Sequence, residues 1–240
     1  MPYYYGFDWT YIVIILPCMI LSIWASSNVN RTFHRYSTQY SARQLTGADA
    51  ARRVLASHGV RDVRIERISG NLTDHYDPKT NVIRLSDSVY DNTSTAAIGV
   101  ACHEAGHAVQ YASHYAPIKL RAAIVPVTNF GSKLAMPLIL LGLVLSFAGN
   151  FSYTLVYIGI ACFSLSVIFQ LITLSVEFNA SRRALQAIEQ CQLLNEEELS
   201  GAKKTLSAAA MTYVAATAVA LAQLLRLLIL FGGRGRRRND

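Results

Sequence analysis

The sequence lacks the features of a disulfide-stabilised or nucleic-acid-binding protein. It has only four cysteines, of which Cys18 and Cys162 lie inside apolar segments, so no disulfide framework is predicted. The formal net charge is +7, yet no basic helix or aromatic-basic module accompanies it. Nucleic acid is therefore not expected as a partner. The chain also has no internal repeat and no low-complexity linker, which excludes repeat architectures.

Lysine and arginine are absent ahead of Arg31, which removes the charged region that a signal peptide needs at its start. The first apolar run covers residues 9–25, close to the shortest length that spans hydrocarbon. Tyr3 to Tyr5 and Trp24 can anchor its ends at the membrane interfaces. We predict that residues 1–29 form an uncleaved N-terminal transmembrane anchor rather than a cleaved signal.

Hydrophobic residues make up 52% of the chain and are clustered, which is typical of a membrane protein. Two apolar stretches, 134–148 and 153–174, flank the short turn 149–152 and predict a transmembrane hairpin over 134–174. The last apolar helix, within segment 208–240, precedes a basic tail.

A polar region over residues 30–133 alternates helix and strand signals. The expected elements are a helix over Gly47–Ser57 capped by Thr46, a strand over 62–68, a hairpin with arms 71–76 and 81–86 around the turn 77–80, and a helix over Thr95–Ala112. A second polar helical region covers 175–207, where Asn195 and Glu198 have capping-box spacing. The predicted fold class is α+β, mainly α-helical, with a small module of helices and strands on a transmembrane helical bundle.

The motif His103-Glu104-Ala105-Gly106-His107 falls within one of these helices. Positions four apart share a helix face, so both imidazoles can bind one zinc ion. Glu104 lies one step around the helix, where its carboxylate can take a proton from a metal-bound water. Two histidines on a helix face can also be purely structural, but the added glutamate at this spacing favours a metal site.

A catalytic zinc site usually has three protein ligands and one open position. The candidates for the third ligand are His114, Glu177, His75 and Asp74. Glu177 is better placed than the others, because a membrane hairpin returns the chain to the side where the motif lies. It could instead form an ion pair with a neighbouring arginine on a solvated helix.

The chain resembles the bacterial membrane neutral zinc metallopeptidases of the YugP-like type over nearly its whole length. The resemblance rests on the segments 72–78, 103–110 and 176–185, which occur in the expected order. A more distant similarity is to the integral membrane gluzincins of the CAAX-processing and heat-shock type. Both place a membrane hairpin between a histidine helix and a glutamate-bearing helix.

This resemblance implies that His103, His107 and Glu177 are zinc ligands and that Glu104 is the general base. It also suggests that the hairpin strand before the histidine helix lies along the substrate cleft, and that His75 stabilises an oxyanion. One difference concerns Ser181, which stands where the distant relatives carry an aspartate that orients a ligand histidine.

The positive-inside rule gives opposing signals about membrane orientation. Basic residues follow the first span and precede the second: Arg31, Arg35, Arg43, Lys119, Arg121 and Lys133. They predict a multi-pass cell-membrane protein whose active site faces the cytoplasm. A fourth full span would place the basic tail on the opposite side. One resolution is that residues 208–231, with Arg226 among them, do not simply cross the membrane. The other is that either the tail or the catalytic region lies outside the cell.

We therefore predict a membrane-embedded metalloendopeptidase whose small zincin-like catalytic module uses one Zn²⁺ ion to hydrolyse peptide bonds in membrane-associated or unfolded proteins. Its expected partners are the lipid bilayer and a peptide or protein substrate. The alternative is a catalytically silent zinc-binding membrane scaffold or adaptor for another protease. An intact Glu104 counts against the scaffold, which has no need of a general base.

Overall fold

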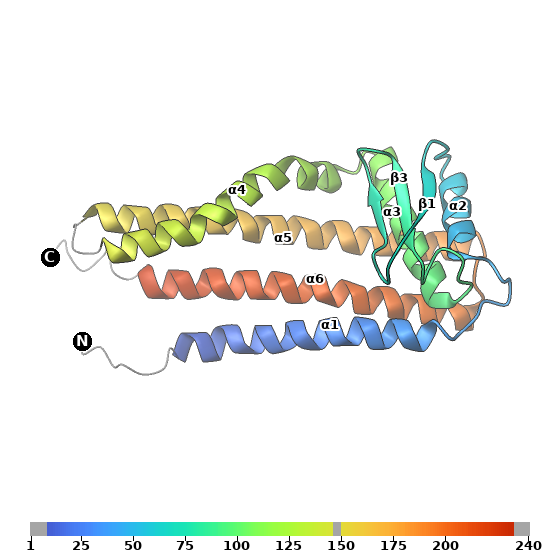
Figure 1. Ribbon diagram of the computed structural model, residues 1–240, viewed down its shortest axis with the longest axis horizontal. Helices are drawn as coiled ribbons and strands as arrows, with labels where there is room; N and C mark the ends of the chain where they lie inside the picture. The colour runs from blue at the N-terminus through green and yellow to red at the C-terminus, as the bar shows by residue number, and fades with distance from the viewer. Residues whose placement is uncertain (1–8, 146–149, 233–240) are drawn as a thin grey trace. The chain divides into compact units, whose positions relative to one another are not determined.

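The computed structural model describes residues 9–145 and 150–232. The anchoring tyrosines 3–5, the first residue of the predicted turn 149–152 and the basic tail lie outside these residues, whereas residues 150–152 belong to a helix rather than a turn. Along the chain the elements are η1 (Tyr11–Ile15), α1 (Leu16–Tyr36), α2 (Gly47–Ser57), β1 (Arg64–Ile68), β2 (His75–Asp77), β3 (Val82–Ser86), α3 (Thr95–Ala112), α4 (Ala116–Val144), α5 (Asn150–Gln190) and α6 (Glu196–Phe231) (Figure 1). The α+β, mainly helical class predicted from the sequence is confirmed.

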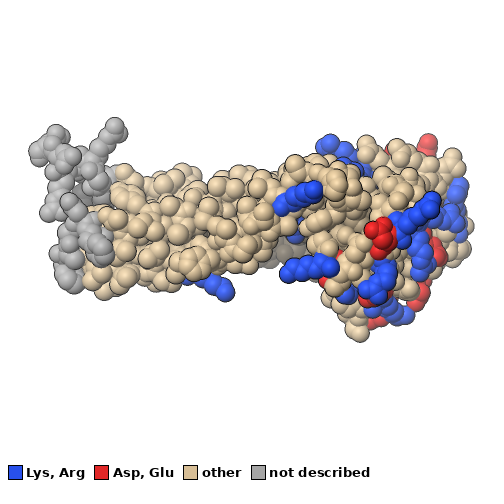
Figure 2. All heavy atoms as spheres, turned by 90° about the horizontal axis from the view of Figure 1, so that it is seen from above, with Lys and Arg blue, Asp and Glu red and all other residues tan. Residues whose placement is uncertain are grey.

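The chain divides into two compact units. The first unit comprises residues 1–24, 121–173 and 214–240, and the second comprises 25–120 and 174–213. Four helices of the described chain are long and apolar enough to cross a membrane, within Tyr11–Tyr36, Ala116–Val144, Ser152–Gln190 and Glu196–Phe231. Charged side chains gather over the second unit, whereas the first is almost free of them in the same view (Figure 2).

The first unit consists of parts of these four helices. Its small interior cluster contains Ile139, Val156, Ile160, Leu227 and Phe231. Glycines let α4 and α5 approach closely, because a Cβ at Gly142 or Gly159 would lie within 3 Å of the facing helix. Many large apolar side chains on these helices are exposed, as expected where lipid takes the place of water.

Segment limits predicted from composition, near residues 29, 133, 174 and 207, fall inside continuous helices. The first span continues to Tyr36, α4 begins at Ala116, and α6 begins at Glu196. Composition changes where a helix passes from apolar to polar surroundings, but the backbone hydrogen bonds continue through that change. Side-chain polarity therefore marks the environment of a helix rather than its ends.

A three-stranded sheet in the second unit has the order β1-β3-β2. The central strand β3 pairs parallel with β1 and antiparallel with β2, with Ile65 opposite Ile83 and Tyr76 opposite Ile83 on the other side. The hairpin was predicted, but β2 is shorter than its predicted arm. The reason is that the Asp74 side chain takes the place of a β2 backbone carbonyl as the partner of β3. Its Oδ1 accepts a hydrogen bond from Ser86 N at 2.7 Å.

Helix caps in the second unit follow the sequence signals. Thr46 Oγ1 accepts from Asp49 N at the start of α2, and Ser94 caps α3 in the same way. At the start of α6, Asn195 N donates to Glu198 Oε2 and Glu198 N donates to Asn195 Oδ1, which is a complete capping box. The core beneath these caps is rich in alanine, which lets α2 and α3 pack closely.

Candidate metal centre

The histidine motif lies in the middle of α3, and the facing helix is α5. The three central residues of the motif are buried and both histidines are half-buried, because α3 packs against the sheet and against the helix that carries Glu177. Close packing requires Gly106, where a Cβ would lie 2.8 Å from the carbonyl oxygen of Ala180. The small residue within the motif therefore sets the spacing between the two helices that supply ligands.

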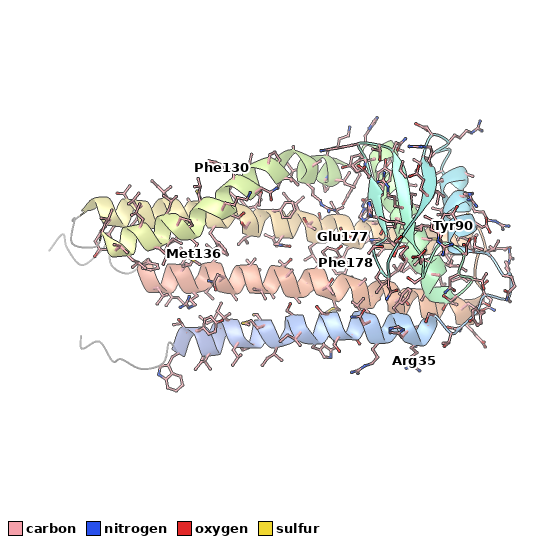
Figure 3. All side chains as sticks on the ribbon, viewed as in Figure 1. Arg35, Tyr90, Phe130, Met136, Glu177 and Phe178 are labelled. Atoms are coloured by element: carbon pink, nitrogen blue, oxygen red, sulfur yellow. The ribbon has the colours of Figure 1, made fainter. Side chains whose placement is uncertain are left out.

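Three side chains converge between these helices. Glu177 projects from α5 where this helix lies beside α3 (Figure 3), and its Oε2 is 3.2 Å from His103 Nε2 and 3.4 Å from His107 Nε2. All three ligand atoms lie within 4.8 Å of one another. Four-coordinate zinc with ligand bonds of about 2.0–2.1 Å places neighbouring ligands about 3.3–3.5 Å apart. The two separations that involve Glu177 are close to this range.

The charge balance of this cluster also favours a cation. Glu177 is only 2% exposed, and a buried carboxylate is costly unless positive charge compensates it. Burial opposes protonation of His107, but its hydrogen bond to Glu177 and the nearby carboxylate of Glu104 outweigh burial and raise the pKa of His107. The same negative surroundings that attract a proton to this imidazole also attract a metal ion. The metal ion binds the imidazole in its neutral form and so takes the place of that proton.

His107 is held in one tautomer by Gln110, which is fully buried. The Gln110 amide nitrogen donates to the carbonyl oxygen of Val176 at 2.8 Å and to Asn179 Oδ1 at 3.0 Å. A carbonyl oxygen only accepts, so Gln110 Oε1 must face His107 Nδ1, at 3.0 Å. His107 Nδ1 is therefore the donor, and its Nε2 carries the lone pair toward the metal position.

The other imidazole has a partner on α5. Ser181 Oγ lies 3.1 Å from His103 Nδ1, so the partner of this imidazole is a hydroxyl. A neutral hydroxyl makes a weaker hydrogen bond to an imidazole N–H than an aspartate does. His103 is oriented, but with less electron donation to its ligand nitrogen.

Glu104 faces a cavity of about 390 Å³ that also contains ligands of the cluster. The cavity is lined by Ser26, Val29, Leu72, Asp74, Val100, His103, Glu104, Glu177, Ser181, Leu206, Ala209, Ala210, Thr212 and Tyr213. Within the described chain, the Glu104 carboxylate makes no hydrogen bond or ion pair, although it is only 8% exposed. It is therefore available to bind a water or a substrate group in the cavity.

Asp74 also lines this cavity. Its two oxygens accept from Ser86 N at 2.7 Å and from Ser86 Oγ at 2.9 Å. Burial raises the pKa of Asp74, the Ser86 hydrogen bonds oppose that change, and the Glu104 carboxylate adds to it. Asp74 thus fixes the segment ahead of β2 against β3 and is not one of the three converging ligands.

The other candidate residues lie elsewhere. His75 is exposed, with Nδ1 2.9 Å from the carbonyl oxygen of Thr73, and it is not among the residues that line the cavity. His114 follows the end of α3 with a left-handed φ of 55°, outside the ligand group. Arg183 is one of the arginines close to Glu177 in the sequence. It donates to Asn179 Oδ1 at 2.8 Å and lies over the ring of Tyr115. Of the four candidates for third ligand, the structure brings only Glu177 to the histidines.

Sequence reasoning assigned no role to Gln110 or Asn179. Gln110 is three residues after His107, so helical spacing alone places it beside that imidazole. Asn179 lies two residues after Glu177, and its contact with Gln110 depends on how α3 and α5 pack. The first residue could have been found from the sequence, and the second could not.

Comparisons with known proteins identify the family of the chain. A family model described as "Putative neutral zinc metallopeptidase" matches residues 11–232. The chain is 46% identical over 221 residues to the "Putative membrane protease YugP" of Bacillus subtilis (strain 168), covering 92% of this chain and 96% of that protein. No solved structure matches the chain. A match that spans nearly every described residue places the chain in this family of zinc metallopeptidases.

Proposed function

We propose that the chain is a membrane-embedded metalloendopeptidase that binds one zinc ion through His103, His107 and Glu177. The observation that carries this proposal is the convergence of three ligand atoms at separations that fit zinc, beside an unpartnered Glu104 in a shared cavity. A structural metal site would have a fourth protein ligand and no cavity. Three ligands beside an open space favour catalysis.

Each residue then has a distinct task in peptide hydrolysis. Zinc bound here would supply a Lewis acid that polarises the scissile carbonyl and lowers the pKa of a water. Glu104 accepts the proton from the attacking water and transfers it to the leaving nitrogen. Gln110 keeps His107 Nδ1 protonated, and Ser181 orients His103. Burial of Glu177 keeps competing water away from its carboxylate.

The sheet suggests how an extended peptide reaches the site. β3, the strand directly before α3, is paired on both edges, so a peptide cannot add to it. β2 is an edge strand, and the segment just before it supplies Leu72 and Asp74 to the cavity wall. A substrate that pairs with the free edge of β2 would continue into this cavity. We therefore assign substrate alignment to β2.

We also propose that all four apolar helices cross the membrane and that the second unit is cytoplasmic. The basic residues next to the first two spans favour this orientation, and the earliest spans weigh most in setting topology. α6 is unbroken, and Arg226 lies about 33 Å along the helix from Lys204, enough to cross about 30 Å of hydrocarbon. An Arg43→Cys variant should react with an impermeant maleimide only after cells are permeabilised; labelling of intact cells would reverse the orientation.

Zinc content and proteolysis test the function together. The protein would be purified in detergent and assayed on casein for wild type, Glu104→Gln, Glu177→Ala and the control Glu189→Gln, an exposed α5 residue outside the cavity. Wild type and control should bind about one zinc and cleave. Glu104→Gln should keep zinc and lose about 100-fold or more of the rate, and Glu177→Ala should lose the metal. Equal cleavage by wild type and Glu104→Gln would refute the mechanism, and bound zinc without cleavage would favour the scaffold.

A further inference from the structure

A second cavity, of about 340 Å³, lies in the second unit between the end of α1 and the beginning of α6. It shares no lining residue with the cavity at the metal centre. Its walls are Asn28, Arg31, Thr32, Arg35 and Tyr36 from α1, and Lys204, Ser207, Ala208 and Met211 from α6. Each set follows helical spacing of three and four residues, so one continuous face of each helix lines the cavity.

The charge of this cavity is entirely positive. Arg31, Arg35 and Lys204 line it, no acidic residue does, and within the described chain none of the three forms an ion pair. α1 has no acidic residue, and α6 has none after Glu198. The cluster is therefore not neutralised by its own helices.

Tyr36 brings two of these cations to one place. The Arg35 guanidinium lies 5.6 Å and the Lys204 ammonium 5.8 Å from the centre of its ring. Arg35 projects from the last turn of α1 (Figure 3). Like charges near one ring repel each other, and a bound anion would offset that repulsion. Asn28, Thr32 and Ser207 add neutral hydrogen-bonding groups suited to phosphate oxygens.

The height of the cluster along the helices identifies the kind of anion. From Tyr11 to Arg31 the helical rise is about 30 Å, which equals the thickness of a bilayer's hydrocarbon core. Arg31 therefore emerges where lipid phosphates lie when α1 crosses the membrane. On α6 the residues that follow Lys204 are mainly apolar, so Lys204 also lies next to an apolar segment. A cationic pocket between membrane helices at headgroup level is a typical site for an anionic lipid.

We propose that this pocket binds the phosphodiester headgroup of an anionic phospholipid. The three cations and the neutral polar groups bind the phosphate, while Ala208 and Met211 contact the glycerol end of the acyl chains. The bound lipid ties the end of α1 to the beginning of α6. The same α6 segment supplies Leu206, Ala209 and Ala210 to the catalytic cavity, so the lipid also supports one wall of that cavity.

Lipid binding can be measured on delipidated full-length protein in a neutral detergent. The probes are dioctanoyl phosphatidylglycerol, dioctanoyl phosphatidylcholine and inorganic phosphate, titrated by calorimetry. Saturable binding of phosphatidylglycerol alone is expected. An Arg31→Gln/Lys204→Gln variant should bind it about 30-fold more weakly, at about fivefold per cation near an anionic membrane surface. Unchanged helicity and zinc content would show that the variant is folded.

The matched control is Arg53→Gln/Lys203→Gln, which removes the same charge from exposed positions outside the pocket. It should bind phosphatidylglycerol as the wild type does. Equal weakening in both double variants would mean that net charge, not the pocket, attracts the lipid, and would overturn the proposal. Binding of inorganic phosphate as tight as that of phosphatidylglycerol would make the ligand a soluble phosphate. Equal binding of phosphatidylcholine would remove the role of anionic charge.

Discussion

Replacing Gln110 by methionine should weaken zinc binding without unfolding the protein. The substitution keeps the volume of the buried side chain but removes three hydrogen bonds. Two of the abandoned partners remain bonded. Asn179 Oδ1 still accepts from Arg183, and the Val176 carbonyl keeps its place in the α5 ladder. His107 Nδ1 is the group left without a partner.

The expected size follows from that one orphaned group. A buried donor without an acceptor costs about 1–3 kcal/mol, and loss of a partner that orients a ligand typically lowers metal affinity about 10–100-fold. We expect a zinc affinity 10–100-fold lower, measured by competition with a chromophoric chelator. In its protonated form, Gln110→Glu keeps an acceptor for His107 Nδ1 and an O–H donor toward the Val176 carbonyl, so it should recover most of the affinity.

Gln186→Met is the matched control, because Gln186 lies on the exposed side of α5. Its zinc affinity should equal that of the wild type. A Gln110→Met protein that binds zinc within about twofold of the wild type would refute the role given to this hydrogen bond. So would a Gln110→Glu protein as weak as Gln110→Met, since that result would show that packing alone matters.

Three further perturbations test other parts of the structure. Gly106→Ala places a Cβ 2.8 Å from the Ala180 carbonyl oxygen, so it should lower the free energy of unfolding by about 1–3 kcal/mol and lower the zinc content. Thermal unfolding and metal analysis measure these two effects, and an unchanged Tm would contradict the close packing of α3 on α5. The Thr80 hydroxyl, with a backbone amide, lowers the pKa of Asp77 to about 2. The ionised Asp77 side chain should therefore stabilise the fold above about pH 4, and this stabilisation should disappear as the pH falls toward 2. In a pH titration of Tm, Asp77→Asn should flatten this part of the curve. A chelator should lower the Tm of wild type and leave that of Glu177→Ala unchanged, since only the former binds metal in the folded state; equal shifts would place the metal elsewhere.

Local signals predicted the parts of the fold that depend on neighbouring residues. Thr46 and the Asn195–Glu198 pair form the caps that their spacing indicates, and Thr95–Ala112 has the predicted limits. Helical spacing also brought His103 and His107 to one face. These features depend on interactions within four residues, which a sequence displays directly.

Contacts between distant segments could not be predicted in the same way. The parallel pairing of β1 with β3 needs a register that no turn fixes, and Asp74 shortens β2 by bonding to a residue twelve positions away. The approach of Glu177 to the histidines was expected from the hairpin, but the contact of Asn179 with Gln110 depends on packing at Gly106. Tertiary packing decides such contacts, and its pattern is not periodic.

The sequence separation of 74 residues between His103 and Glu177 has a consequence for biosynthesis. During translation, α3 leaves the ribosome well before the helix that completes the ligand set. A nascent chain at that stage has Glu104 and both imidazoles but not Glu177, and the two intervening apolar segments are synthesised before Glu177. With the ligand set and the membrane topology proposed above, the order of the sequence would keep the chain inactive until its membrane segments are in place.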